Sequence, residues 1–493
     1  MKTLASFLTV LIFLVSFSAL AQPGSLDGSF GINGKVLKNM DFTGQSVAIQ
    51  KDGKIVVCGA SNGNFGLIRF NTNGSVDSGF GVNGTVTTSF GSDYVEPVGV
   101  AIQKDGKIIV AGSIRKWIGY MDIYGFALAR YKTNGLLDHS FGDKGKVITA
   151  NETVDYIRAA TLALQADGKI LVAGNNISEY FSQVILHRYN TDGANDADFH
   201  PDTGFSIYDL MNSIALQSDQ KIIGTGFTYV NHTKFHFLLT RFKTDGSLDS
   251  AFANAGKNTT GLETGVAVAV LKNDKIAALT DSSSLKQFTR DGVADSLFGK
   301  NGKVSVPFKA KAIAAQSNKI IVIGMKNGNF AIARYKLSGK LDNSFGINGI
   351  AVANFGGNDE AAAVAIRKQD GKIVTTGSSD TYQLAVARFN GDSNTASVAG
   401  NTVITNAHDA SKKSLSVNIY PNPFRSTLNI DFISTGKTRK KISVYDMRGS
   451  LLYTTSTVGS TRLNLRSLVY GSYLIKVTDE NGKELYNGKV IKQ

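Results

Sequence analysis

Cysteine, proline and long apolar segments are scarce in this sequence. Cys58 is the one cysteine among 493 residues, which excludes an intrachain disulfide, and we interpret it as a small buried strand residue rather than a reactive thiol. With 6 prolines and 42% hydrophobic residues, the chain does not have the composition of a disordered protein. Beyond the first 21 residues no segment is apolar for long enough to span a membrane. We therefore expect a folded chain whose stability comes from packing.

The first 21 residues have the order of a secretory signal peptide. Lys2 precedes the apolar run LASFLTVLIFLVSFSALA, which ends in Ala19-Leu20-Ala21, a small-residue cleavage site before Gln22. An uncleaved membrane anchor is the alternative, because the run approaches the length that a bilayer requires. We predict cleavage and a mature chain outside the inner membrane, without a transmembrane segment.

Glycine is abundant, with 52 residues, and it belongs to an internal repeat. Three markers each occur seven times at intervals of about 52 residues. The phenylalanine of the line LDGSFGINGKV recurs, with varying neighbours, at Phe30, Phe80, Phe141, Phe199, Phe252, Phe298 and Phe345. The lysine of a motif close to Asp-Gly-Lys-Ile recurs at Lys54, Lys107, Lys169, Lys221, Lys275, Lys319 and Lys372. An arginine before an aromatic residue recurs at Arg69, Arg130, Arg188, Arg241, Arg334 and Arg388, with Gln287 in the remaining copy.

Each copy has the local signals of about four short antiparallel strands. SVAIQ and KIVVCG are rich in β-branched residues and flank Asp52-Gly53, a dipeptide typical of tight hairpins. GLIRF and GTVTTSF are the third and fourth candidates. A unit of this size cannot bury both faces alone, so the copies must stack, and seven copies suit a closed β-propeller.

The two ends of the repeat support ring closure. The chain starts with a fourth-strand segment, SFGINGKV, and the last copy stops after its third strand, LAVARF. We predict that the N-terminal strand completes the seventh blade and removes the open sheet edges. Residues present in every copy, such as Asp27, Phe30 and Gly31, are then interpreted as scaffold: turn acceptor, inter-blade filler and turn glycine.

The lines LDNSFGINGI, VAIQKDGKIIVAG and FALARYKTNG resemble the delta-60 repeat of secreted bacterial proteins. The resemblance covers roughly residues 24–390 and implies a β-propeller-like array without an established activity. Two copies depart from the pattern. His200 follows Phe199 where the motif has glycine, and Asn273-Asp274 replaces Asp-Gly, so we expect distorted turns there.

A second β domain follows a polar linker. We predict a signal peptide at 1–21, a propeller at 22–390, a linker at 391–414 and a small β-sandwich at 415–493, because short alternating strands are separated there by PNP, RGS and ENG. The fold class expected for the whole chain is all-β, a seven-bladed β-propeller followed by a small C-terminal β-sandwich.

The C-terminal domain is similar to the type A sorting domain of the type IX secretion pathway, through VNIYPNPFRSTLNIDF, VYDMRGSLLYTT and LVYGSYLIKVTDENGKELYNGKVIKQ. An ordinary adhesive sandwich is the alternative. The resemblance implies export across the outer membrane by the type IX machinery, removal of the tail in the linker, and surface attachment or release. The residues that fall in its signature blocks are Tyr420, Pro421, Asn422, Pro423, Gly449, Tyr470, Gly471, Ser472 and Tyr473.

The positive charge is concentrated in this removable domain. Residues 411–493 hold 14 Lys and Arg against 5 Asp and Glu, a net charge of +9, which leaves +5 of the chain's +14 for the rest. We therefore do not predict nucleic-acid binding.

The sequence contains no nucleophile elbow, phosphate-binding loop or zinc signature, and it offers no clear catalytic set. Calcium is a weak alternative to no cofactor, because Asp192, Asp196, Asp198 and Asp202 cluster in one turn region, without EF-hand spacing. The strongest recognition candidate is the longer segment SIRKWIGYMDIYG, interpreted as an exposed loop or as cover for a blade edge. Its candidate ligand-contact residues are Arg115, Lys116, Trp117, Tyr120 and Tyr124.

Two functions follow as hypotheses. The first is a secreted or cell-surface binding protein, without catalysis, that holds polysaccharide, peptide or another surface protein. The second is a propeller enzyme, a polysaccharide lyase or glycoside hydrolase, which requires non-repeating titratable residues at one end of the central channel. A purely structural coat component would leave both faces featureless.

Overall fold

The structure is a computed structural model that describes residues 22–492 apart from 92, 119–120, 151–155, 178–181, 202–208, 231–233, 381–382, 393–416, 421–423, 433–438, 448, 481 and 483. The predicted signal peptide and residues 393–414 of the predicted linker lie outside the described residues. The chain divides into two compact units, Met1–Asp409 and Ala410–Gln493. Across the described ranges, no helix is long and apolar enough to cross a membrane.

The first unit contains seven sheets, which we number as blades in ring order. Blade 1 holds β2 (Ser46–Ile49), β3 (Ile55–Ser61), β4 (Asn64–Phe70) and β5 (Thr85–Thr88). Blade 2 holds β6 (Tyr94–Ile102), β7 (Ile108–Ile118), β8 (Met121–Tyr131) and β9 (Lys146–Ala150); blade 3 holds β10 (Tyr156–Leu164), β11 (Ile170–Ile177) and β12 (Ser182–Tyr189). Blade 4 holds β13 (Leu210–Leu216), β14 (Ile222–Val230), β15 (Lys234–Phe242) and β16 (Lys257–Asn258).

The remaining blades follow the same order. Blade 5 holds β17 (Gly265–Val270), the 3-10 turn η1 (Lys272–Asp274), β18 (Ile276–Thr280), β19 (Ser284–Phe288) and β20 (Lys303–Ser305). Blade 6 holds β21 (Lys309–Gln316), β22 (Lys319–Lys326), β23 (Asn329–Lys336) and β24 (Ile350–Ala353). Blade 7 holds β25 (Asp359–Ile366), β26 (Ile373–Ser379), β27 (Gln383–Phe389) and, as its fourth strand, β1 (Lys35–Asn39).

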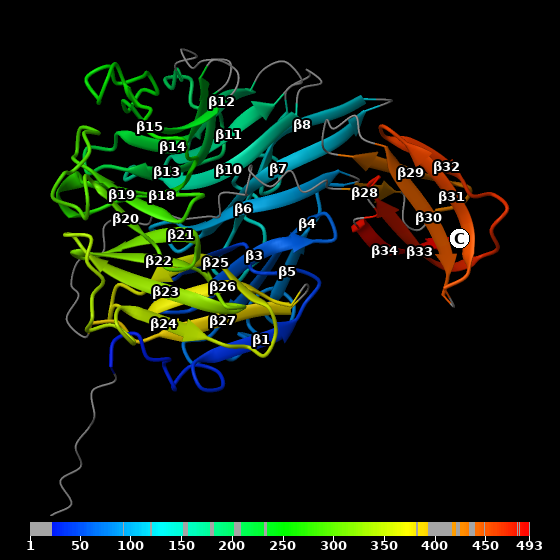
Figure 1. The fold of residues 1–493 in the computed structure, drawn as a ribbon, viewed down its shortest axis with the longest axis horizontal. Helices are drawn as coiled ribbons and strands as arrows, with labels where there is room; N and C mark the ends of the chain where they lie inside the picture. Colours follow the sequence, from blue (N-terminus) through cyan, green and yellow to red (C-terminus); the bar gives the residue numbers. More distant parts are fainter. Residues whose placement is uncertain are drawn as a thin grey trace, which may run out of the picture. The chain divides into compact units, whose positions relative to one another are not determined.

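The blades close into a ring. The innermost strands β2, β6, β10, β13, β17, β21 and β25 contact one another in that order, and β25 contacts β2. The dark blue β1 lies beside the yellow β27, with Lys35 opposite Ala387 and Asn39 opposite Gln383 (Figure 1). The predicted closure by the N-terminal strand is therefore confirmed, and the repeat forms a β-propeller.

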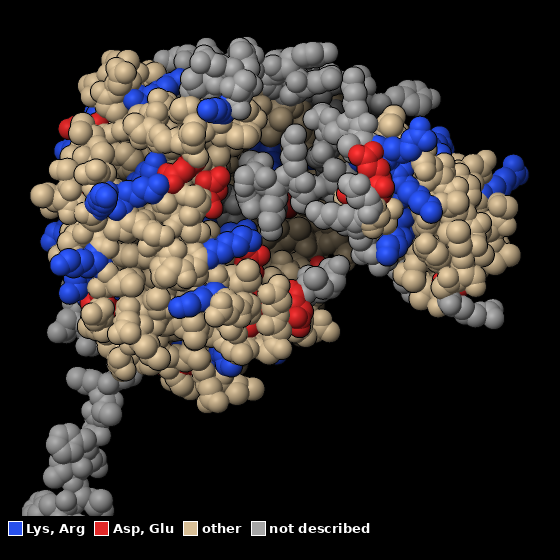
Figure 2. Space-filling model, in the orientation of Figure 1, with Lys and Arg blue, Asp and Glu red and all other residues tan. Residues whose placement is uncertain are grey.

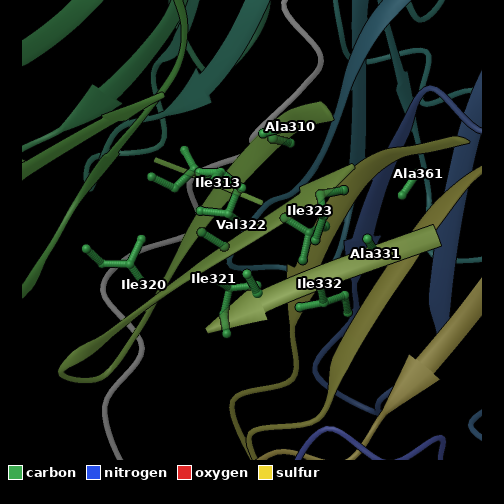
Figure 3. Close-up of a cluster of buried hydrophobic side chains, with 14 of the residues drawn as sticks. Ala310, Ile313, Ile320, Ile321, Val322, Ile323, Ala331, Ile332 and Ala361 are labelled. Carbon is green, nitrogen blue, oxygen red and sulfur yellow. The ribbon is translucent and has the colours of Figure 1, made fainter. Parts of the chain in front are cut away.

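The core lies between neighbouring blades, because both faces of every sheet are apolar. Figure 3 shows one such layer, in which Ile321 and Ile323 of β22 and Ile332 of β23 belong to the same buried cluster. Complete burial of an aliphatic side chain of this size contributes about 1.5 to 3 kcal/mol. Cys58 is fully buried in β3, as predicted.

The hairpin between the first two strands of a blade contains a residue with positive φ, which is glycine in blades 1, 2, 3 and 7, Gln220 in blade 4 and Ser317 in blade 6. Gly53 has a φ of +85° in blade 1. In blade 5, Asn273 and Asp274 adopt φ values of 65° and 59° in η1, a conformation that costs side-chain-bearing residues more than glycine. The predicted distortion of this turn is confirmed. The corresponding irregular region after Phe199 lies largely outside the described residues.

The second unit consists of two sheets around its own core. One sheet has the order β28 (Val417–Tyr420), β29 (Thr427–Phe432) and β32 (Thr461–Asn464). The other has the order β31 (Leu451–Thr457), β30 (Lys440–Asp446), β33 (Gly471–Thr478) and β34 (Glu484–Lys492). Leu428, Ile430, Ile442 and Ile475 pack together between the sheets. The strand β32 was not predicted, because TRLN contains one apolar residue.

Candidate functional site

One face of the propeller carries the repeated motifs, and we call it the turn face. In blade 1, Arg69 Nε lies 2.7 Å and Lys54 Nζ 2.9 Å from Asp77 Oδ2, while the guanidinium carbon lies 4.5 Å from the centre of the Phe80 ring. Arg69 also donates a hydrogen bond to the carbonyl of Thr133 in blade 2. This buried ion cluster therefore ties one blade to the next.

The same cluster recurs around the ring. The Arg–Asp pairs are Arg130–Asp138, Arg188–Asp196, Arg241–Asp249, Arg334–Asp342 and Arg388–Asp27. In blade 5 a neutral side chain takes the arginine's place, and Gln287 Nε2 donates to Asp295 Oδ2 over 2.8 Å. Because the aspartate occurs in every blade and the arginine in six of seven, they form scaffold, as the repeat pattern predicted. The arginine marker is visible in the sequence, but its buried ion pair with the aspartate is seen only in the structure.

The clusters keep their carboxylates ionised. Burial alone would raise the pKa of Asp138, but hydrogen bonds from Lys107 and Ser140 and the charge of Arg130 outweigh it and lower that pKa to about 2. The pKa of Asp342 is lowered to about 2 in the same way by Lys319, Ser344 and Arg334, against the effect of burial.

The opposite face carries the hairpins between the second and third strands of each blade, and we call it the variable face. The segment interpreted as a loop at 113–125 is instead a strand hairpin. Arg115 pairs with Tyr124, Lys116 with Ile123 and Trp117 with Asp122. β-branched and aromatic residues extend β7 and β8 to 11 residues each. Tyr120 and the side chain of Trp117 lie outside the described part.

Three tyrosines and an arginine lie close together where blade 2 borders its neighbours. Tyr94 of β6 lies opposite Arg115, and Arg115 lies opposite Tyr124, so the three positions form a row in the strand register, and the Tyr94 ring lies beside Gly63 of blade 1. Tyr156 of β10 contacts Tyr124 edge to face, with ring centres 4.8 Å apart and an interplanar angle of 73°. The side chain of Tyr94 is 53% exposed. We call Tyr94, Arg115, Tyr124 and Tyr156 the tyrosine cluster.

The tyrosine hydroxyls of this cluster are neutral near pH 7. Burial raises the pKa of Tyr94, and the charge of Glu96 raises it further, while Arg115 lowers it by less. Burial also raises the pKa of Tyr156, against the lowering effect of Arg158. Both hydroxyls therefore offer a donor and an acceptor to a ligand, and neither is suited to act as a base.

Beside the tyrosine cluster lies the mouth of the central channel. The innermost strands of blades 2 to 7 each contain a bulge, and the residue before it opposes a glycine of the next strand in every blade but blade 5, where Gly265 opposes Thr280. The residue one position earlier in the chain is the one of interest. A Cβ at Gly112, for example, would lie 2.1 Å from the carbonyl oxygen of Glu96. The seven equivalent residues, which we call the mouth positions, are Thr43, Glu96, Arg158, Leu210, Thr264, Lys309 and Glu360.

The mouth positions do not repeat, in contrast to the turn face. Four of the seven are charged, and Lys309 Nζ and Lys311 Nζ each lie 3.2 Å from Glu360 Oε1. The pKa of Glu360 is lowered because these two ammonium groups outweigh its burial. Figure 2 shows acidic and basic residues interspersed on the propeller, without a large area of one sign.

The acidic turn region has a structural role. Asp196 Oδ2 lies 2.8 Å from Lys169 Nζ and 2.5 Å from Arg188 Nε. Asp192 accepts a hydrogen bond from the amide of Ala194. Asp202 lies outside the described residues. Among the residues that the structure describes, no group of three or more His, Cys, Asp or Glu side chains is placed to hold a metal ion.

Comparison with known families supplies the context for both units. Residues 418–493 match the family described as "Secretion system C-terminal sorting domain". Six segments match "Domain of unknown function (DUF5122) beta-propeller", at 50–80, 103–141, 165–199, 217–252, 316–345 and 368–395. The chain carries DUF5122 β-propeller repeats and a type IX secretion sorting domain. It is therefore a secreted or cell-surface protein. The unmatched copy is blade 5, which lacks the arginine and the Asp-Gly turn.

Solved structures that resemble this DUF5122 propeller protein are distant. The polysaccharide lyase Uly1 is 13% identical, with 71% of this chain and 90% of that chain covered and a TM-score of 0.43. PorZ, a bacterial surface component of the type-IX secretion system of Porphyromonas gingivalis, is 13% identical. The match covers 94% of this chain and 70% of PorZ, with a TM-score of 0.32. No curated protein matches the sequence.

The sorting domain places its signature residues in different environments. Gly449 has a φ of +90° in the turn between β30 and β31. Tyr473 is buried in β33 and donates a hydrogen bond to the carbonyl of Val469 over 2.5 Å, whereas Tyr470 is 81% exposed, next to Gly471 at the start of β33. Tyr420 ends β28, and Pro421, Asn422 and Pro423 lie outside the described residues.

Proposed function

We propose that this protein binds a polysaccharide outside the cell through the tyrosine cluster. The observation that carries the proposal is the non-repeating row of Tyr94, Arg115 and Tyr124 with Tyr156 packed against it. Aromatic faces bind the apolar faces of sugar rings at low entropic cost, since tyrosine has only two side-chain torsions. The adjacent hydroxyl and guanidinium groups supply hydrogen bonds to sugar hydroxyls. Arg115 and Tyr124 are two of the residues that the sequence singled out.

Binding without catalysis agrees with the protonation of the cluster. A catalytic tyrosine base needs a pKa lowered toward neutrality, but the pKa values of Tyr94 and Tyr156 are raised. The cluster therefore suits recognition better than proton abstraction.

The charged mouth positions favour a second candidate, a polysaccharide lyase or glycoside hydrolase. They are non-repeating titratable residues at one end of the channel, the arrangement such an enzyme requires. Glu96 and Glu360 belong to blades 2 and 7, with blade 1 between them. Prolonged incubation of the protein with each polysaccharide, followed by measurement of new reducing ends and of absorbance from unsaturated products, separates the two functions.

The first test is thermal unfolding of a chain of residues 22–493, which keeps the sorting domain, with a panel of polysaccharides. A ligand that binds only the folded state raises the melting temperature, and the shift grows with the logarithm of its concentration relative to its dissociation constant. The double variant Tyr94→Ala and Tyr124→Ala should abolish the shift. Tyr470→Ala is the matched control, because this exposed tyrosine lies in the sorting domain. A shift that survives the double variant would place binding elsewhere and reject the proposal.

A further inference from the structure

We propose that the bound polysaccharide is acidic, and that Arg158 at the channel mouth binds its carboxylate beside the tyrosine cluster. This inference rests on the proposed function and names the class of its ligand. A carboxylate matches the planar fork of a guanidinium with two parallel hydrogen bonds, which gives geometric specificity as well as affinity.

The first reason is that Arg158 has no partner. Within the described residues, the side chain of Arg158 makes neither a hydrogen bond nor an ion pair. It is also partly buried. A guanidinium that loses water without gaining an acceptor is costly, and the scaffold arginines such as Arg334 avoid this cost by pairing with aspartate. An anionic ligand would supply the missing acceptor.

The second reason is that the nearest acceptors are already occupied. Asn175 lies opposite Arg158 on β11, but its Nδ2 donates to the carbonyl of Met211 over 2.8 Å and its Oδ1 accepts from the Met211 amide over 2.7 Å. The carboxylate of Glu96 also has a partner of its own. No rearrangement of these side chains is needed to leave the Arg158 guanidinium available.

The third reason is the position of Arg158 relative to the tyrosine cluster. Arg158 and Tyr156 are two residues apart on β10, and the positive charge of Arg158 acts on the Tyr156 hydroxyl. Across the ring, three blades away, Lys309 and Lys311 share the single carboxylate of Glu360. Cationic groups therefore flank the mouth on both sides, and a sugar ring on the tyrosines brings its carboxylate to Arg158.

The test compares two polymers that share a backbone and differ in charge, with a sulfated polymer of another backbone as a third. Polygalacturonate carries carboxylates, its fully methyl-esterified form is neutral, and dextran sulfate carries sulfate. Binding of each to the full mature chain is measured by titration calorimetry. We expect polygalacturonate to bind at least tenfold more tightly than the methyl ester, and Arg158→Gln to remove this preference, because a charge-assisted hydrogen bond is lost. Arg290→Gln, which removes an exposed guanidinium paired with Asp219, is the matched control and should leave the preference intact.

The outcomes separate this inference from the proposed function. The acidic and neutral polymers could bind equally, with binding lost in Tyr94→Ala and unchanged in Arg158→Gln. That result would overturn the inference that the ligand is acidic, but it would support the proposed polysaccharide site. If dextran sulfate binds in an Arg158-dependent way and polygalacturonate does not, the inference that Arg158 binds a carboxylate is overturned. Retention of the preference in Arg158→Gln with loss in Arg290→Gln would overturn the role of Arg158. Thermal unfolding of each variant verifies the fold.

Discussion

The inter-blade ion cluster makes a quantitative prediction for Asp138→Asn. Asp138 Oδ2 forms ion pairs with Arg130 Nε at 2.8 Å and with Lys107 Nζ at 3.1 Å, and the Arg130 side chain is only 6% exposed. Removal of the carboxylate leaves a buried guanidinium without a counter-ion, a change that costs about 3 to 5 kcal/mol of the free energy of unfolding.

Blade 5 provides the matched control, Asp295→Asn. Its partners are the neutral Gln287 and the ammonium of Lys275, whose side chain is 36% exposed and can return to water. The substitution leaves no buried charge without a counter-ion. We therefore expect the free energy of unfolding to fall by about 1 to 2 kcal/mol, typical of a lost hydrogen bond. Urea unfolding followed by fluorescence of Trp117, the one tryptophan, reports on the propeller. Equal losses in the two variants would refute the argument that the guanidinium depends on the carboxylate.

Three further outcomes are expected. Because the pKa of Asp138 is about 2 in the folded state and near 4 when unfolded, its contribution is complete above about pH 4 and is lost as pH falls toward 2; a urea midpoint constant from pH 5 to 2.5 would contradict this. Gly226→Ala should cost about 1 to 3 kcal/mol, since a Cβ there lies 1.9 Å from the carbonyl oxygen of Leu210, whereas Gly28→Ala meets no atom within 4 Å and should be near neutral in the same urea assay. The pKa of the Cys58 thiol is raised to about 12 by burial, so it should resist a thiol reagent at pH 8 until urea unfolds the chain; rapid labelling of the native protein would show that the site opens.

Most of the fold could be predicted because the same strand and turn signals occur in seven copies of the repeat. Each copy supplies the glycine turns, the apolar strands and the filler phenylalanine, so an irregularity in one copy does not obscure the rest. The position of β1 followed from the phase at which the repeat starts and stops. The marker arginine was visible in the sequence, but its pairing with Asp77 and its equivalents depends on how the segment after the third strand folds back.

The candidate site was only partly predictable. Arg115 and Tyr124 were identified because they interrupt the repeat, but Tyr94 and Tyr156 were not, since they lie 62 positions apart in two copies and only blade packing joins them. Arg158 was invisible in the sequence for the same reason. An unpaired guanidinium is a property of its surroundings, and those surroundings come from β11 and β13.

Ring closure by β1 also fixes an order of events. Asp27 must wait for Lys372 and Arg388, which lie more than 340 residues later in the chain. During synthesis or passage through a pore, the first segment therefore has no strand to pair with until the last repeat is present. The outer edge of β27 has no partner strand until β1 pairs with it. A chain halted after its sixth repeat cannot complete the circle with its own first strand in the native register. The time at which the last repeat becomes available thus sets the earliest time at which the propeller can close.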